Sequence, residues 1–326
     1  MEPVGLGFIG YGIMGERLLR AAVAHDPATL RVSGVWDPSP QAMARLARDF
    51  PDLSGSASSE ALIEESDCIY IASPPASHLG HARRALGRGR AVLCEKPLAT
   101  DLDDAARFVA EAESTAARVV VNFPFASSFA VDQLRSWIAQ GRVGAPRSLR
   151  IEVAFATWPR SWQRDAASWL DRRPEGGFTR EVVSHFLFLS RRLLGPLHLT
   201  RSAAEYPEAD RSERAIEAEF RAGEVPARLT GRVGATDKDD HNSWTLEGES
   251  GAIRLRDWSI AERLDQGRWM PAPEALPNER IRPLVLKRQL DKVAALTRGA
   301  AQDLATAREA LEVQRVVEAI PRGEAA

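Results

Sequence analysis

The feature that most constrains this chain is a hydrophobic strand that leads directly into three spaced glycines and then into a helical stretch. Gly10 permits a tight turn, Gly12 lets the backbone approach a pyrophosphate, and Gly15 allows close packing of helix on strand. The helix that follows, Glu16–Ala24, presents free N–H groups to an anion. Because strand, glycines and helix agree, we predict a dinucleotide-binding turn. Its predicted cofactor contacts are Gly10, Tyr11, Gly12, Ile13, Met14 and Gly15.

A second apolar run, 31–36, ends at Asp37, about twenty positions beyond the last glycine. This spacing is typical of a carboxylate that binds the ribose hydroxyls of NAD, and its charge repels a 2′-phosphate. The next four residues, 38–41, include no cation. The pattern therefore predicts NAD as the cofactor, with NADP as the alternative. A competing interpretation is a solvated turn aspartate before a proline.

The length and composition favour a two-domain globular protein. The 326 residues exceed the roughly 100–200 of an ordinary domain. We therefore expect two domains, a dinucleotide-binding Rossmann domain at 1–122 and a second domain at 123–326. A net charge of −2 gives no general attraction to nucleic acid. We also expect no membrane partner and a cytoplasmic location, since the sequence shows no signal pattern and no apolar run of about 18 residues.

The first domain alternates short strand patterns with helical ones, which predicts an α/β Rossmann fold with a doubly wound parallel sheet. Strands are expected at 4–9, 31–36, 68–72, 91–94 and 118–121, and helices at 14–25, 40–49, 59–65, 77–88 and 101–114. Cys68 and Cys94 lie inside two of these strands, which favours buried thiols over a disulfide or a metal site, and no metal site is predicted.

The second domain has consecutive strand patterns with short turns, which predicts an α+β domain with an open, mostly antiparallel sheet. Strands are expected at 147–157, 197–206, 215–221, 227–234, 242–247, 252–257 and 260–264. Helices are expected at 128–140, 179–194, 281–298 and 303–320.

Two loops of the first domain carry polar residues at strand ends. The carboxyl ends of parallel strands face the ligand crevice, so Ser73 and Pro74 after one strand and Glu95-Lys96-Pro97 after the next are predicted at the cofactor. Lys96 should lie toward the nicotinamide end. His78 is either part of this cofactor site or a first-turn helix residue, and both interpretations stay open.

The chain resembles the Gfo/Idh/MocA oxidoreductases. It has the marks of that family in order: the glycine turn, a proline loop after strand four, Glu95-Lys96-Pro97 at strand five, and Gly176-Gly177 followed by an acid and a histidine. The resemblance extends through 246–253 and the helix at 307–311. It implies a Rossmann domain, a substrate-binding and oligomerisation domain at 123–326 with an open, predominantly antiparallel sheet, and a homodimer or homotetramer.

The acid and the histidine are Glu181 and His185, which share one face of a helix at this spacing. The family usually has Asp at position 181 and a further Asp where this chain has Phe188. Arg180 adds a cation and is predicted at the substrate. The alternative is a buried helix histidine bonded to its own carboxylate.

Further substrate contacts are predicted at Asn122, which ends the last Rossmann strand, and in a loop rich in tryptophan and arginine. Within that loop Trp162 and Arg164 suit a sugar ring or an anionic substituent, and equally a subunit interface.

The predicted function is an NAD(P)-dependent oxidoreductase that transfers hydride between nicotinamide and a secondary alcohol or ketone of a sugar or cyclitol derivative. A base must take the hydroxyl proton, and Lys96 and His185 are the candidates, with Glu181 orienting the histidine. One alternative is an imine or tetrapyrrole-type reductase. Another is a non-catalytic regulator that senses dinucleotide or sugar; such relatives tend to lose the lysine or the histidine, and this chain has both.

Overall fold

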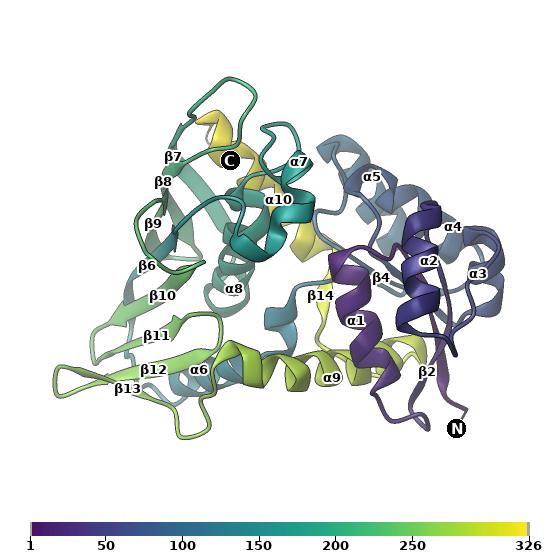
Figure 1. The fold of residues 1–326 in the computed structure, drawn as a ribbon. Coiled ribbons are helices and arrows are strands. Elements are labelled where there is room, and N and C mark those ends of the chain that lie inside the picture. The colour runs from purple at the N-terminus through teal and green to yellow at the C-terminus, as the bar shows by residue number, and fades with distance from the viewer. Residues whose placement is uncertain (1, 325–326) are drawn as a thin grey trace. The chain divides into compact units, whose positions relative to one another are not determined.

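The structure is a computed structural model that describes residues 2–324, except for the side chains of residues 164, 165 and 167. The chain forms two compact units (Figure 1). One comprises Met1–Ser127 and Pro283–Leu311, and the other comprises Ser128–Arg282 and Glu312–Ala326. A single boundary at 122/123 does not describe these units, because residues 283–311 return to the first one.

The first unit contains the doubly wound parallel sheet that the sequence predicts. Its strands are β1 (Val4–Ile9), β2 (Leu30–Trp36), β3 (Cys68–Ile71), β4 (Ala91–Cys94), β5 (Val119–Val121) and β14 (Ala305–Thr306), in the order β14-β5-β4-β3-β1-β2. The strand order reverses at β1, which lies between β3 and β2. The proline loop and Glu95-Lys96-Pro97 follow the third and fourth strands, so the count of strands four and five was wrong by one.

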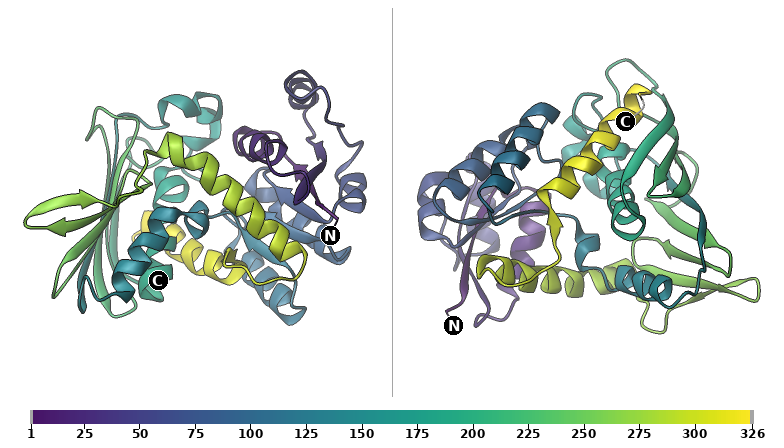
Figure 2. Two further views of the ribbon diagram at one scale, coloured as in Figure 1. Left: turned by 90° about the horizontal axis from the view of Figure 1, so that it is seen from below. Right: turned by 180° about the vertical axis from the view of Figure 1, so that it is seen from behind.

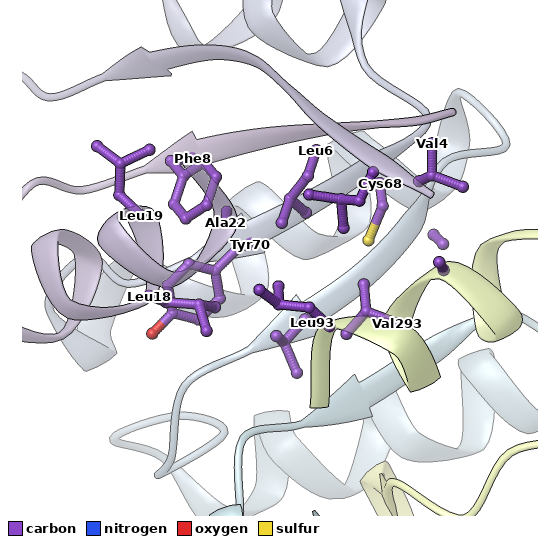
Figure 3. Packing of buried hydrophobic residues seen from close by; sticks show 14 of the residues in the cluster. Val4, Leu6, Phe8, Leu18, Leu19, Ala22, Cys68, Tyr70, Leu93 and Val293 are labelled. Carbon is purple, nitrogen blue, oxygen red and sulfur yellow. The ribbon is translucent and has the colours of Figure 1, made fainter. Parts of the chain in front are cut away.

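Helices flank this sheet and complete its core. They are α1 (Ile13–Val23), α2 (Pro40–Asp49), α3 (Ser59–Glu65), α4 (His78–Gly87) and α5 (Leu102–Ser114). Apolar residues of α1, among them Leu18 and Leu19, pack against Phe8 of β1 and Tyr70 of β3 (Figure 3). In the same unit, α3 contacts β1 and β2, and α4 contacts β3 and β4. This packing fixes the carboxyl ends of the strands, where the predicted cofactor loops begin.

The segment that returns to the first unit supplies part of its core. Leu290, Val293 and Ala294 of α9 (Asn278–Thr297) are buried in the same cluster as residues of β1 and α1. Figure 2 shows α9 as a long yellow-green helix. After α9, β14 pairs antiparallel with β5. The helix predicted at 303–320 therefore begins only at α10 (Ala307–Ala319), because β14 covers the edge of β5 that would otherwise expose unpaired backbone groups.

The second unit contains an open eight-stranded sheet, and only the pair β6 and β9 is parallel. Its strands are β6 (Pro146–Phe155), β7 (Leu197–Glu205), β8 (Ala215–Ala222), β9 (Val225–Val233), β10 (His241–Gly248), β11 (Ala252–Arg256), β12 (Ile260–Asp265) and β13 (Arg268–Pro271), in the order β13-β12-β11-β10-β6-β9-β8-β7. Its helices are α6 (Phe129–Ala139), α7 (Ala167–Leu170) and α8 (Ser184–Leu194). The indole of Trp244 on β10 donates to Ser190 Oγ of α8 at 2.9 Å, which ties this helix to the buried face of the sheet. The predicted mostly antiparallel sheet is confirmed.

Candidate functional site

The three glycines after β1 differ in the space that a side chain would have at each position. Gly10 has φ +99°, and a Cβ there would lie 2.6 Å from the backbone of Ala72. At Gly15 a Cβ would lie 2.1 Å from the carbonyl oxygen of Gly10. At Gly12, which precedes α1, a Cβ would meet nothing within 4 Å. Contacts within the chain explain the first two glycines, whereas the open space at Gly12 suits a ligand that approaches the helix N-terminus, as a pyrophosphate does.

The first two residues of α1 border that space. The side chain of Ile13 is 36% exposed, and Met14 is half-buried, with its sulfur 3.6 Å from a guanidinium nitrogen of Arg17. An exposed aliphatic side chain beside Gly12 offers a cofactor an apolar surface at the rim of the turn.

Asp37 connects the end of β2 to the glycine turn. Its Oδ2 accepts the backbone N–H of Tyr11 and its Oδ1 accepts that of Ser39, both at 2.8 Å. The carboxylate is half-buried, so it is more than a solvated turn residue, and each oxygen keeps a second lone pair for a ribose hydroxyl. Tyr11 itself is buried, and burial together with Glu16 raises the pKa of its phenol to about 12. The Tyr11 ring is part of the packing of the first unit, and its backbone N–H is bonded to Asp37.

His78 joins the two loops that follow β3 and β4. Its ring is 1% exposed, and the two ring nitrogens lie 2.8 Å from the carbonyl oxygens of Ser73 and Pro97. Burial lowers the pKa of this imidazole. Ser73 Oγ also lies 2.7 Å from Ser77 Oγ, while Pro74 is exposed. The neutral imidazole has one N–H and can donate to only one of these two carbonyl oxygens. Its contacts reach both loops, and a place for His78 in the cofactor site stays a prediction.

A buried polar network lies at the ends of β4 and β5. The Glu95 carboxylate accepts hydrogen bonds from the hydroxyl of Tyr70 and, at 2.5 Å, from the side-chain amide of Asn122. Gln289 of α9 in turn donates to Asn122 Oδ1 at 2.6 Å. Burial and the negative charge of Glu95 raise the pKa of Tyr70. This network fixes the backbone beside Lys96, which is half-buried, and it uses both ends of the Asn122 side chain.

In the second unit, Glu181 and His185 do not lie on one uninterrupted α-helix. Residues Thr179–Val183 form a π-turn, and α8 begins only at Ser184. The shared face expected from α-helical periodicity stays a prediction, and π-turns are frequent at functional sites. Both side chains are half-buried. Phe188, where the family has an acid, is buried beneath the guanidinium of Arg192 at 5.0 Å.

The glycine pair before this turn is explained by packing. Gly177 has φ +99°, and a Cβ there would lie 2.3 Å from the carboxylate of Glu213. That carboxylate accepts the N–H and the hydroxyl of Thr179 at 2.7 and 2.6 Å, which anchors the start of the π-turn.

Arg180, predicted at the substrate, takes part in an internal ion pair. Its Nε and Nη2 donate to Glu318 of α10 at 2.8 and 2.7 Å. Its Nη1 donates to the carbonyl oxygens of Arg173 and Gly176. The guanidinium thus connects the glycine pair to α10.

The sequence did not indicate that Arg160 organises the tryptophan-rich loop. Its side chain is 6% exposed and donates to Asp240 at 2.8 Å and to Gln163 at 2.9 Å. The guanidinium also lies 4.7 Å from the ring centre of Trp162, which is 43% exposed. Gln163 Nε2 lies 3.5 Å from Glu181 Oε1. Arg164, the predicted substrate contact, lies outside the described side chains.

Trp258 also contributes to this group and was not predicted. Its indole N–H donates to Asp240 at 3.3 Å, and its ring packs at 76° to that of His185, with 5.6 Å between the ring centres. Arg160, Asp240, Trp258 and His185 therefore form a continuous chain of contacts within the second unit. These residues come from four segments of the sequence, and none belongs to a spacing motif that joins them.

Other site types are not evident in the part of the chain that the structure describes. Between residues 2 and 324, no three His, Cys, Asp or Glu side chains are grouped to hold a metal ion. Cys68 and Cys94 are buried free thiols. Within the same range, none of the helices combines the length and the apolar character that a bilayer span requires.

The first unit matches a known family of proteins. Residues 4–123 match the model of the GFO_IDH_MocA oxidoreductase family with an NAD-binding Rossmann fold. The first unit therefore carries the NAD-binding domain typical of the Gfo/Idh/MocA oxidoreductases. Glucose-6-phosphate 3-dehydrogenase of Bacillus subtilis is 30% identical over 164 residues, 48% of this chain and 47% of that protein. Inositol 2-dehydrogenase of Rubrobacter xylanophilus is 34% identical over 172 residues, 49% of this chain and 45% of that protein.

The chain thus spans about half the length of these curated relatives. Similarity over the whole length comes from solved structures. Levoglucosan dehydrogenase in complex with NADH and levoglucosan superimposes with a TM-score of 0.82 over 98% of this chain and 96% of that one, at 18% identity. At this identity the likeness shows the fold of both units and no more.

Proposed function

We propose that this chain is a member of the Gfo/Idh/MocA family and an NAD-dependent dehydrogenase or reductase acting on a secondary alcohol or ketone of a sugar or cyclitol derivative. The observation that carries the proposal is the glycine turn. Among the three glycines of the turn, Gly12 is the one with open space where its side chain would be, at the N-terminus of α1, while Asp37 is held beside the turn by two backbone N–H groups. These residues fit a dinucleotide: the helix N-terminus suits its pyrophosphate and the carboxylate suits its ribose.

Bound nicotinamide supplies the hydride acceptor or donor, and the residues of the chain handle the proton. Lys96 follows β4, the place where parallel strands present residues to the cofactor, and the network around Glu95 fixes its backbone. Lys96 is the first candidate for the base that takes the hydroxyl proton. His185 is the second candidate, with Glu181 orienting it.

The substrate class rests on the relatives. Their names assign them glucose 6-phosphate and inositol as substrates, and the structural neighbour holds levoglucosan. All are polyhydroxylated rings. The named relatives are dehydrogenases, so neither an imine or tetrapyrrole-type reductase nor a non-catalytic regulator is favoured. Glu181 and Phe188 stand where the family usually has aspartates, so the particular ring compound that this chain uses must be found by experiment.

A substrate panel tests the proposal. Purified protein is incubated with NAD⁺ or NADP⁺ and with inositol, levoglucosan and glucose 6-phosphate, and reduced nicotinamide is followed by its absorbance. We expect turnover of at least one ring polyol with NAD⁺, and turnover lower by a factor on the order of 10²–10⁴ in the matched variant Lys96→Met. Failure of NADH to bind in a titration, or absence of turnover with all three polyols, would contradict the proposal.

The family resemblance also implies a homodimer or homotetramer, which we propose for this chain. The second unit has an open sheet with exposed charged residues on β6, β8 and β9, such as Arg150, Glu219 and Arg228. Sedimentation velocity would measure the mass in solution, and a monomer at micromolar concentration would contradict the proposal.

A further inference from the structure

The hairpin that joins β11 to β12 contains a strained tryptophan. Ser259 N–H donates to the carbonyl of Arg256 at 3.3 Å, and the two residues between them, Asp257 and Trp258, have φ +46° and +72°. Two successive positive φ values are those of a type I′ turn, which strongly prefers Gly at its second central position. A bulky residue there is a backbone outlier. The sequence therefore places an aromatic ring where glycine would be relaxed.

The rest of the hairpin holds this conformation in place. The N–H of Asp257 donates to the carbonyl of Asn242 at 2.9 Å. Its carboxylate accepts from His241 Nδ1 at 2.7 Å, from the N–H of Asn242 at 3.3 Å and from Arg256 at 3.1 Å. Strain that surrounding contacts maintain in this way points to a function for the strained residue.

The strained turn places the indole of Trp258 against the imidazole of His185. The ring centre of Trp258 lies 5.6 Å from the ring centre of His185 and 5.2 Å from that of Phe186, so the indole packs against two successive residues of α8. The indole N–H is fixed by Asp240, and Asp240 is fixed by the buried Arg160. The indole is thereby held at both its nitrogen and its ring, with the imidazole against it at 76°.

We propose that Trp258 is a positioning residue for His185: the strained turn and Asp240 hold the indole so that it fixes the plane of the imidazole. The inference rests on the proposed function, in which His185 is a candidate for proton transfer. Fixing the ring in a productive orientation contributes to turnover, because a misplaced catalytic group loses rate without losing the substrate.

Three substitutions of one residue separate this role from simple packing. Trp258→Gly and Trp258→Ala both remove the indole, but only glycine accepts the positive φ without strain. Trp258→Phe keeps an aromatic ring and loses the bond to Asp240. Each variant is tested in the full-length protein by thermal unfolding, by steady-state kinetics and by proton NMR of the histidine rings. The signals of His185 are identified by their loss in His185→Asn.

We expect the ring signals of His185 to shift in the Gly and Ala variants and to shift less in Phe. We expect kcat to fall on the order of 10–100-fold in Gly and Ala, with little change in KM or NADH affinity, and to recover substantially in Phe. Thermal unfolding should occur at a higher temperature in Gly than in Ala. His185 signals that stay unchanged in Gly, or a loss confined to KM, would overturn the inference. A wild-type protein without turnover on any substrate would contradict the proposed function itself, and the NMR result is independent of that outcome.

Discussion

The two units of this protein gather their polar residues by different means. In the first unit, Gly12, Asp37 and Lys96 come within three residues of the ends of the parallel strands β1, β2 and β4, so the topology alone brings them to one edge. In the second unit, Arg160 and Trp258 reach the neighbourhood of α8 through side-chain contacts between segments far apart in the sequence. We therefore expect a site positioned by the backbone to tolerate substitutions of neighbouring side chains. A site positioned by side-chain contacts should lose its arrangement when any one of those side chains is replaced.

The largest expected effect tests whether the first unit carries the proton chemistry. Lys96→Met should lower turnover by a factor on the order of 10²–10⁴, because the general base is removed, and should leave NADH binding largely intact. Lys96→Arg keeps the charge but cannot exchange a proton near neutral pH, so it should be comparably slow. Steady-state kinetics and an NADH titration measure both properties. Near-normal turnover in the Met variant would leave Lys96 a structural companion of Pro97.

The next effect tests the dependence of the second unit on single side chains. Arg160→Met leaves the carboxylate of Asp240 without its buried partner, which should cost about 3 kcal/mol of unfolding free energy. Arg150→Met is the matched control: that arginine is exposed and its closest carboxylate, Glu247, is 4.0 Å away, so the cost should stay below about 1 kcal/mol. Urea unfolding of both variants gives the difference. Equal costs would show that Arg160 does not organise its loop.

A smaller effect concerns the choice of cofactor by the first unit. Asp37→Ser removes the charge that repels a 2′-phosphate, and should shift binding preference from NADH toward NADPH by about 1–3 kcal/mol. Competitive titration of the two dinucleotides measures the shift. A wild-type protein that already binds NADPH more tightly would refute the assignment of Asp37.

The smallest effect is a pH dependence that originates in buried histidines of the first unit. Burial lowers the pKa of His78 and His81 below the ordinary value of about 6.5. Below that pH the unfolded chain binds protons that the folded chain excludes, so stability should fall from pH 7 to 5, by at most about 1.4 kcal/mol per pH unit for each histidine. His81→Gln should show a shallower fall in urea unfolding. An unchanged slope would exclude His81 as a source.

The sequence predicted the first unit better than the second for a physical reason. The alternation of strands and helices locates Gly12, Asp37 and Lys96 at strand ends before any tertiary contact is known. The role of Gln289 depends on α9 packing into a core formed by residues far earlier in the chain. Similarly, α-helical spacing pairs Glu181 with His185, yet it cannot reveal that a π-turn precedes α8. No local pattern indicates that Trp258 occupies a glycine-like turn position.

Two glycines of the turn after β1 together test whether this turn binds a dinucleotide. Gly12→Ala adds a methyl group where the chain has no neighbour within 4 Å, so unfolding free energy should change by no more than about 1 kcal/mol. Gly15→Ala forces a Cβ to within 2.1 Å of the Gly10 carbonyl oxygen, and should cost about 2 kcal/mol or more.

The decisive measurement is the affinity of Gly12→Ala for NADH, taken by titration with its thermal unfolding alongside. We expect a stably folded variant whose NADH affinity falls by roughly tenfold or more, because the added methyl group fills the space left for the pyrophosphate. A folded Gly12→Ala protein that binds NADH as tightly as the wild type would contradict dinucleotide binding at this turn.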